Sequence, residues 1–189
     1  MSLDLQNRMM AAVQAVYGEL PLVFGEGPAD RPLLTVIGEA PGAEEEKLRR
    51  PFVGKAGKNL DLFLATLGLP REAVYITNLV KLHPTKISKA GREVNRPPTK
   101  AEVALFAPFL QEELSMVAPQ FIATLGNFPL KAVLGDDKAT IGDCHGRLIE
   151  LGDGRRIFPL YHPAAIIYNQ SLKAVYESDL VELKKVLNT

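Results

Sequence analysis

The chain of 189 residues contains a single cysteine, Cys144, and no tryptophan. Because Cys144 has no second thiol to pair with, an internal disulfide is excluded, and so is a metal site made of several cysteines. A chain with so few thiols is typical of the reducing cytoplasm, which is the compartment we expect for this protein.

Long hydrophobic runs are also missing. No apolar stretch approaches the roughly 18 residues that a membrane-spanning helix needs. Residues 3–16 mix polar and apolar side chains, and they lack the hydrophobic centre of a secretory signal. We therefore expect no membrane partner.

A net charge is absent as well, because 22 lysines and arginines balance 22 aspartates and glutamates. The charges are unevenly distributed, however, and one basic segment carries Glu93 as its sole acidic residue. A basic segment on a neutral body fits local contact with phosphates, but taken alone it favours an ordinary solvated loop. Its cations are Lys81, Lys86, Lys89, Arg92, Arg96 and Lys100.

The apolar pattern predicts strands that alternate with helices. Short apolar runs bounded by turn residues are typical of buried parallel strands, and they cover residues 33–37, 73–80, 119–125 and 155–160. Amphipathic helical patterns cover residues 4–17, 59–67, 99–117 and 172–187. This alternation predicts one α/β domain over residues 1–189, a three-layer α/β/α sandwich with a central, mainly parallel four-stranded sheet. We expect an N-terminal helix within residues 1–18, a basic loop over residues 83–98 and a hairpin turn at residues 152–154.

Four polar side chains stand at the carboxyl ends of the expected strands: Glu39, Asn78, Asn127 and His162. In an open parallel sheet these ends meet at one edge, which is where ligands bind. Phe52 lies in a loop between the first two of these strands and offers a flat ring for stacking. Taken singly, Phe52 is more typical of a core residue and Asn127 of a helix cap. Their joint placement favours a shared site.

The side chains at this edge suit a planar base. The amide of Asn78 offers both a donor and an acceptor, which matches an edge that presents N–H beside C=O. His162 can donate a hydrogen bond to a carbonyl oxygen on which negative charge develops. Glu39 can position a water molecule or stabilise a cationic sugar.

Several longer motifs follow one another in a fixed order: Gly38-Glu39-Ala40-Pro41-Gly42, Arg50-Pro51-Phe52-Val53-Gly54-Lys55-Ala56-Gly57, Tyr75-Ile76-Thr77-Asn78, Asn95-Arg96-Pro97-Pro98 and Tyr161-His162-Pro163-Ala164. In this combination they resemble the uracil-DNA glycosylase superfamily, and within it family 4, the iron–sulfur type. The resemblance implies a DNA repair enzyme that flips uracil out of DNA and hydrolyses its N-glycosidic bond. DNA and uracil are the implied partners, and a monomer is expected.

The resemblance also implies a role for each site residue. Phe52 would stack on the flipped uracil, Asn78 would read its N3 and O4 edge, and His162 would stabilise the charge that develops at O2. Glu39 would lie near the sugar or the attacking water. The pocket would be completed by Gly38, Ala40 and Gly42. DNA contacts are expected from Lys81, Arg96, Pro163, Ile166 and Ile167.

The chain departs from family 4 at the iron–sulfur cluster. That family holds a [4Fe–4S] cluster on four cysteines, and thiolates are the required ligands. Leu82 and Phe106 stand at the third and fourth of these positions here, and residues 14–20, where the first pair falls, contain no cysteine. We therefore expect no cluster in this chain, and we expect apolar packing of Leu82 and Phe106 in its place.

Three questions stay open at this point. Ala40 stands where other families carry an aspartate that activates water, so the group that activates water is unassigned. Gly42 stands where some relatives carry a bulky residue that excludes the methyl group of thymine, so hypoxanthine or xanthine is an alternative substrate base. The same fold also suits a non-catalytic module that binds nucleic acid or a damaged base.

Overall fold

A five-stranded sheet lies at the centre of the described part of the chain. The computed structural model describes residues 1–188, apart from the side chains of Ile167 and Tyr168. The strand order is β2-β1-β5-β7-β6. The parallel strands are β1 (Leu34–Gly38), β2 (Tyr75–Asn78), β5 (Phe121–Leu125) and β7 (Arg156–Leu160). The predicted parallel core is confirmed, but the predicted count of four strands is one too low, because the turn at residues 152–154 folds the short β6 (Ile149–Glu150) antiparallel against β7.

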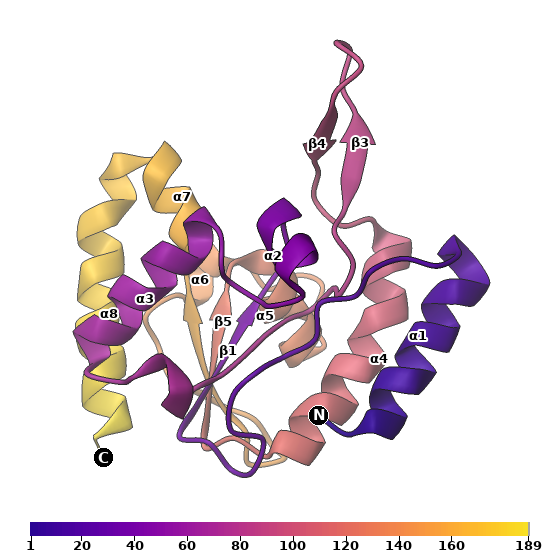
Figure 1. Ribbon diagram of the computed structural model, residues 1–189. Coiled ribbons are helices and arrows are strands. Elements are labelled where there is room, and N and C mark those ends of the chain that lie inside the picture. Colours follow the sequence, from indigo (N-terminus) through magenta and orange to yellow (C-terminus); the bar gives the residue numbers. More distant parts are fainter. Residues whose placement is uncertain (189) are drawn as a thin grey trace.

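Helices cover both faces of this sheet, which makes the predicted three-layer sandwich (Figure 1). Val36 of β1 packs in one apolar cluster with Phe63 and Leu180, whereas its neighbour Ile37 packs in another cluster with Phe106. Successive side chains of a strand point to opposite faces, so both faces are buried. One face is covered by α3 (Lys55–Leu67) and α8 (Lys173–Leu187), and the other by α1 (Leu3–Tyr17), α4 (Lys100–Val117) and α5 (Asn127–Leu134).

Local sequence signals fix where two of these helices begin and end. At the start of α4, Thr99 Oγ1 accepts a hydrogen bond from the Glu102 amide at 3.1 Å, and the Glu102 carboxylate accepts one from the Thr99 amide at 2.7 Å. This reciprocal pair is the capping box that the sequence predicts. At the end of α3, Gly68 adopts a φ of 77°, a left-handed conformation that glycine enters without steric cost.

Short elements lie between the strands and the main helices. They are α2 (Ala43–Leu48), η1 (Arg71–Ala73), α6 (Ile141–Cys144), α7 (Pro163–Tyr168) and η2 (Gln170–Leu172). Because α2 follows β1 and α7 follows β7, both stand at the carboxyl edge of the parallel strands. Among the described residues, no helix combines the length and the apolar character needed to cross a bilayer.

The segment expected as a basic loop forms a β-hairpin instead. It pairs β3 (Thr85–Ile87) with β4 (Glu93–Asn95) in antiparallel register, and Lys86 lies opposite Val94. The expectation of a basic loop over residues 83–98 is therefore corrected for residues 85–87 and 93–95, which form strands. β-Branched residues on both strands favour extended backbone, and Gly91 closes the turn with a φ of 72°. Figure 1 shows the hairpin projecting from the body near α2.

Candidate active site

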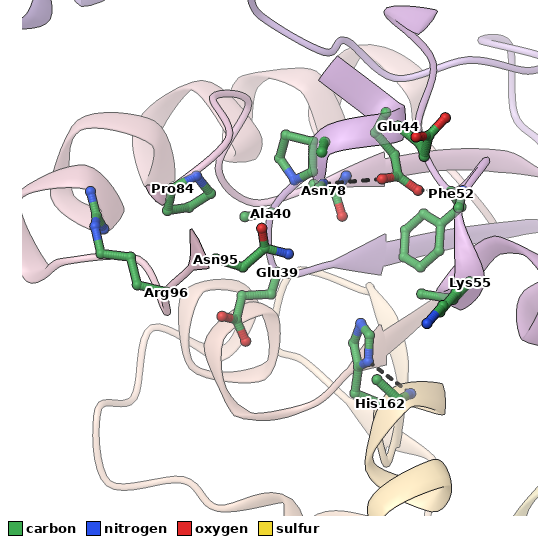
Figure 2. Close-up of a pocket in the computed structure, with 17 residues that line it drawn as sticks. Glu39, Ala40, Glu44, Phe52, Lys55, Asn78, Pro84, Asn95, Arg96 and His162 are labelled. Atoms are coloured by element: carbon green, nitrogen blue, oxygen red, sulfur yellow. Dashed lines mark hydrogen bonds between the residues drawn. The ribbon is translucent and has the colours of Figure 1, made fainter. Parts of the chain in front are cut away.

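A pocket of about 710 Å³ opens at the carboxyl edge of the sheet. Glu39, Phe52, Asn78 and His162 line it together, as the strand-tip argument predicts (Figure 2). The structure does not bring Asn127 to this pocket, because its side-chain oxygen accepts a hydrogen bond from the Ile141 amide at 2.7 Å. Asn127 therefore ties α6 to α5.

Two of these side chains converge over Gly38 at the end of β1. A methyl group on Gly38 would overlap both Phe52 Cζ and Asn78 Oδ1. Any larger residue at position 38 would push the aromatic ring and the amide out of place. Gly38 thus makes room for the stacking ring and the base-reading amide to approach each other.

A buried carboxylate holds the loop that carries Phe52. Phe52 has a φ of 52°, an uncommon left-handed conformation for a residue with a side chain, and its neighbours must maintain it. Glu45 accepts hydrogen bonds from the amides of Gly42 at 3.1 Å, Val53 at 3.0 Å and Gly54 at 2.7 Å. Glu45 was not predicted as a site residue, although its place three residues after the Gly42 helix cap is a recognisable capping signal.

His162 lies close to Phe52, with ring centroids 6.4 Å apart and an interplanar angle of 28°. Its Nδ1 accepts a hydrogen bond from the Ala164 amide at 3.1 Å. An accepting Nδ1 carries no proton, so the neutral ring is protonated on Nε2. Burial lowers the pKa of His162 to about 4. At neutral pH this imidazole is therefore an uncharged hydrogen-bond donor.

Asn78 and Glu39 present unpaired polar groups to the pocket. Asn78 is 2% exposed, and within the described residues its side-chain amide makes no protein hydrogen bond. Burial raises the pKa of Glu39, whose carboxylate likewise has no ion-pair partner among the described residues. Unpaired groups of this kind are available to a ligand.

Behind Asn78, a fully buried charge pair fixes the end of β2. Lys81 Nζ donates to the Asn78 carbonyl oxygen at 2.7 Å and pairs with Glu113 of α4 at 2.7 Å. Tyr75 donates its hydroxyl to the same carboxylate at 2.8 Å, and Thr77 does so at 3.0 Å. The prediction that Lys81 contacts DNA is wrong, because its side chain is 0% exposed and its ammonium faces the interior. Lys81 instead anchors the backbone that carries the base-reading amide.

The other expected DNA contacts have different surroundings. The Arg96 guanidinium is engaged by Glu102 at 2.6 and 2.7 Å, and it also donates to the Thr85 carbonyl oxygen at 2.9 Å. Arg96 thus lines the pocket while it anchors the base of the hairpin to α4. Pro163 is buried, and Ile166 is half-buried against the same core as Phe52, so neither protrudes. The side chain of Ile167 lies outside the described residues.

Several residues line the pocket without having been predicted as site residues, and two of them, Lys55 and Asn95, carry polar side chains at its rim. Lys55 is exposed at the first position of α3, and Figure 2 shows it across the pocket from Arg96. Asn95 of β4 reaches the rim, where its side-chain oxygen lies 2.8 Å from Nε2 of His83. Asn95 stands in one of the motifs of the resemblance, but the hairpin that brings it to the pocket was not predicted.

The two side chains at the positions that the resemblance assigns to cluster ligands are apolar and supply no thiolate. Leu82 and Phe106 are 4% and 0% exposed, and they share an apolar cluster with Met9 and Val13 of α1. Their predicted packing together is confirmed. Within the described part of the chain, no group of three or more His, Cys, Asp or Glu side chains could hold a metal ion.

Comparison with known proteins agrees with this geometry. The model of the uracil DNA glycosylase superfamily matches residues 24–184. A Type-4 uracil-DNA glycosylase of Archaeoglobus fulgidus is 37% identical over 156 residues, which cover 79% of this chain and 74% of that protein. Proteins of the same name from Sulfurisphaera tokodaii and Thermotoga maritima are each 34% identical to this chain. Each alignment covers 88% of this chain, and it covers 75% of the S. tokodaii protein and 83% of the T. maritima protein. The chain therefore belongs to the uracil-DNA glycosylase superfamily.

Proposed function

We propose that this protein is a DNA repair glycosylase that hydrolyses the N-glycosidic bond of uracil in DNA. The observation that carries the proposal is the convergence of Glu39, Phe52, Asn78 and His162 on one pocket. A uracil buried inside duplex DNA cannot reach such a pocket, so the nucleotide must be flipped out. The relatives named Type-4 uracil-DNA glycosylase support the same activity.

The pocket geometry suits a departing uracil anion. The Phe52 ring stacks on the base, and the Asn78 amide donates to O4 and accepts from N3–H. When the bond between C1′ and N1 breaks, its electron pair moves into the uracil ring, and negative charge grows on O2. The Nε2–H of His162 donates a hydrogen bond to that oxygen. Because its pKa is about 4, His162 does so as a neutral group.

Glu39 serves the sugar side of the reaction. Its unpaired carboxylate stabilises the positive charge that develops on the sugar and positions the water that adds to C1′. Ala40, the next residue, offers no carboxylate, so no second acid assists from the usual place. We assign this role to Glu39 because it is half-buried at the end of β1, and burial raises its pKa. Of the other pocket carboxylates, Glu44 is exposed on α2 and Glu45 is bonded by backbone amides.

We also propose that the enzyme works as a cytoplasmic monomer without an iron–sulfur cluster. The apolar packing of Leu82 and Phe106 supports the absence of the cluster. No step of the reaction above requires one. Iron content and visible absorption of protein purified without oxygen test this point, and stoichiometric iron and sulfide would contradict it.

The activity is tested with uracil-containing single- and double-stranded oligonucleotides, followed by alkaline cleavage of the abasic product. We expect uracil release by the wild type and a loss of about 10²–10³-fold in kcat for His162→Ala, the scale for removal of a donor to a developing anion. Asn127→Ala is the matched control, since Asn127 lies outside the pocket. DNA binding without release of any base would show a binding module instead, and release of hypoxanthine or xanthine alone would show another lesion specificity.

A further inference from the structure

The outer end of the β3–β4 hairpin, near the pocket, carries charged side chains that form no ion pair with the described residues. Its outer residues Lys86, Lys89 and Arg92 are exposed, and no carboxylate of the described residues pairs with any of them. The hairpin carries one acid, Glu93, whose carboxylate accepts a hydrogen bond from Thr85 at 2.7 Å. The projecting end therefore holds an excess of positive charge.

We propose that this hairpin is a DNA-binding arm that grips the strand flanking the flipped nucleotide. The proposal rests on the proposed function, since it takes DNA as the substrate. A cationic β-ribbon suits this partner, because unpaired lysine and arginine side chains bind phosphates through counterion release. Such contacts position the strand without reading its sequence.

The register of the hairpin shows which of its residues lie on the same side as the pocket. Thr85 pairs with Asn95, and Ile87 pairs with Glu93. Residues directly opposite each other, and residues two apart, share one face of a ribbon. Ile87 is therefore on the same face as Asn95, which lines the pocket, and it lies two residues further out.

Glu93 shares this face, whereas Lys86, opposite Val94, is on the other face. Lys89 and Arg92 lie between the two strands, so the cations surround the outer end of the arm and do not line its pocket-side face.

Ile87 adds an apolar contact to this arm. Its side chain is 70% exposed, so it is free to contact a bound strand. Two residues of strand place it about 7 Å beyond Asn95. At that distance Ile87 meets the nucleotide next to the flipped one, and we assign it to packing against that sugar or base.

The base of the arm is bonded to α4 and to α2, so DNA bound at its outer end has a fixed position relative to the pocket. Arg96 bonds both Glu102 of α4 and the Thr85 carbonyl oxygen. His83 bridges Glu46 of α2 at 3.3 Å and Asn95 at 2.8 Å. A strand held by the arm is therefore held in a fixed position relative to the pocket. Lys55, on the other side, completes a path for the strand across the opening.

The test compares a variant with Lys86→Ala, Lys89→Ala and Arg92→Ala against a control with Arg31→Ala, Lys184→Ala and Lys185→Ala. The control removes equal charge: Lys184 and Lys185 lie in the last turn of α8, and the Arg31 amide bonds the Val117 carbonyl oxygen at the end of α4. In Figure 1 the C-terminal ends of both helices lie away from the hairpin. Uracil release is measured on a single-stranded 20-mer over a range of salt concentrations. We expect the arm variant to raise KM about tenfold at low salt, and to flatten the log–log salt dependence of kcat/KM by about two, since each lost phosphate contact contributes about 0.7.

A short substrate separates loss of the arm from damage to the pocket. With one nucleotide on each side of uracil, Ile87 still has a nucleotide to contact but the outer cations Lys86, Lys89 and Arg92 have no further strand to bind, so wild type and the triple variant should have equal kcat/KM. Equal KM and equal salt slopes on the 20-mer would overturn the proposal. An equal loss on both substrates would overturn it as well, because the pocket would then be the part affected.

Ile87→Ser tests the apolar contact, with Val181→Ser as the matched control on α8, where Val181 is 52% exposed. Ile87→Ser should raise KM on the 20-mer about threefold and leave the salt slope unchanged, because no charge is removed. An effect no larger than that of Val181→Ser would overturn this part. Binding of a uracil-free oligonucleotide, followed by fluorescence anisotropy, tests the arm even if no uracil is released. Failure of the arm and failure of the proposed function are thus distinguishable.

Discussion

Lys81 and the cations of the hairpin belong to one basic stretch but lie in opposite surroundings. Lys81 is fully buried, and its ammonium is bonded by Glu113, Thr77 and the Asn78 carbonyl oxygen. Lys86 and Lys89 are exposed and have no carboxylate partner among the described residues. Arg96 is intermediate, since it is 24% exposed and paired with Glu102. Positive charge therefore has three separate uses within twenty residues: to fix the pocket, to anchor the arm and to meet a partner.

The buried pair should show the largest effect. Lys81→Met leaves the Glu113 carboxylate buried without its counter-charge, and we expect the free energy of unfolding to fall by about 3–5 kcal/mol. Urea unfolding measures it, and Lys100→Met is the matched control on an exposed lysine of the same stretch. Adding Glu113→Leu to Lys81→Met should restore part of the stability, because the unpaired charge is then gone while the buried hydroxyls of Tyr75 and Thr77 lose their acceptor. A loss below 1 kcal/mol in Lys81→Met would show that the two regions do not differ.

Arg96 should show a smaller effect that depends on pH. Hydrogen bonds from Arg96 lower the pKa of Glu102, so the pair stabilises the fold above the ordinary glutamate pKa of about 4.3 and loses that contribution as the pH falls through the lowered pKa. We expect Arg96→Met to cost about 1–2 kcal/mol at neutral pH, since the arginine is partly solvated. The free energy of unfolding of wild type and of Arg96→Met is compared at neutral pH, where Glu102 is ionised, and at about pH 3, where the contribution of the pair is reduced. An equal cost at both would contradict the ion-pair explanation.

The hairpin cations should show almost no effect on stability. Lys89→Ala removes an exposed side chain without a protein partner among the described residues, so we expect a change within about 0.5 kcal/mol. The same substitution should weaken binding of a 20-mer at low salt. Thermal unfolding and fluorescence anisotropy measured on one preparation give both values. A destabilisation of several kcal/mol would mean that Lys89 has a structural role like that of Lys81.

Titration of His162 should have no effect on activity near neutral pH. Because burial lowers its pKa to about 4 and Nδ1 already accepts the Ala164 amide, the ring stays a neutral donor at ordinary pH. The pH profile of kcat/KM should therefore show no step near 6.5, the usual pKa of histidine. A step there that disappears in His162→Gln would contradict a neutral His162.

The local sequence was sufficient for the parallel core and for the residues at its edge. The apolar run at residues 33–37 is followed directly by Gly38 and Glu39, and the next strand ends at Asn78. Strand periodicity and the rule for parallel sheets then place Glu39, Asn78 and His162 at one edge, because covalent order and a right-handed crossover leave few other arrangements.

Only the tertiary structure decided what the polar and charged residues around that edge do. Glu113 lies 32 residues from Lys81 in the sequence, and it is the buried carboxylate that pairs with the Lys81 ammonium. Glu45 bonds the amides of residues 53 and 54 across a loop, and the pairing of β3 with β4 aims Ile87 and Asn95 in one direction. The energy of a charge depends on its dielectric surroundings and its partner, and both come from residues distant in sequence. Residue type and spacing therefore determined where the pocket forms, and packing decided which cations support it and which remain free.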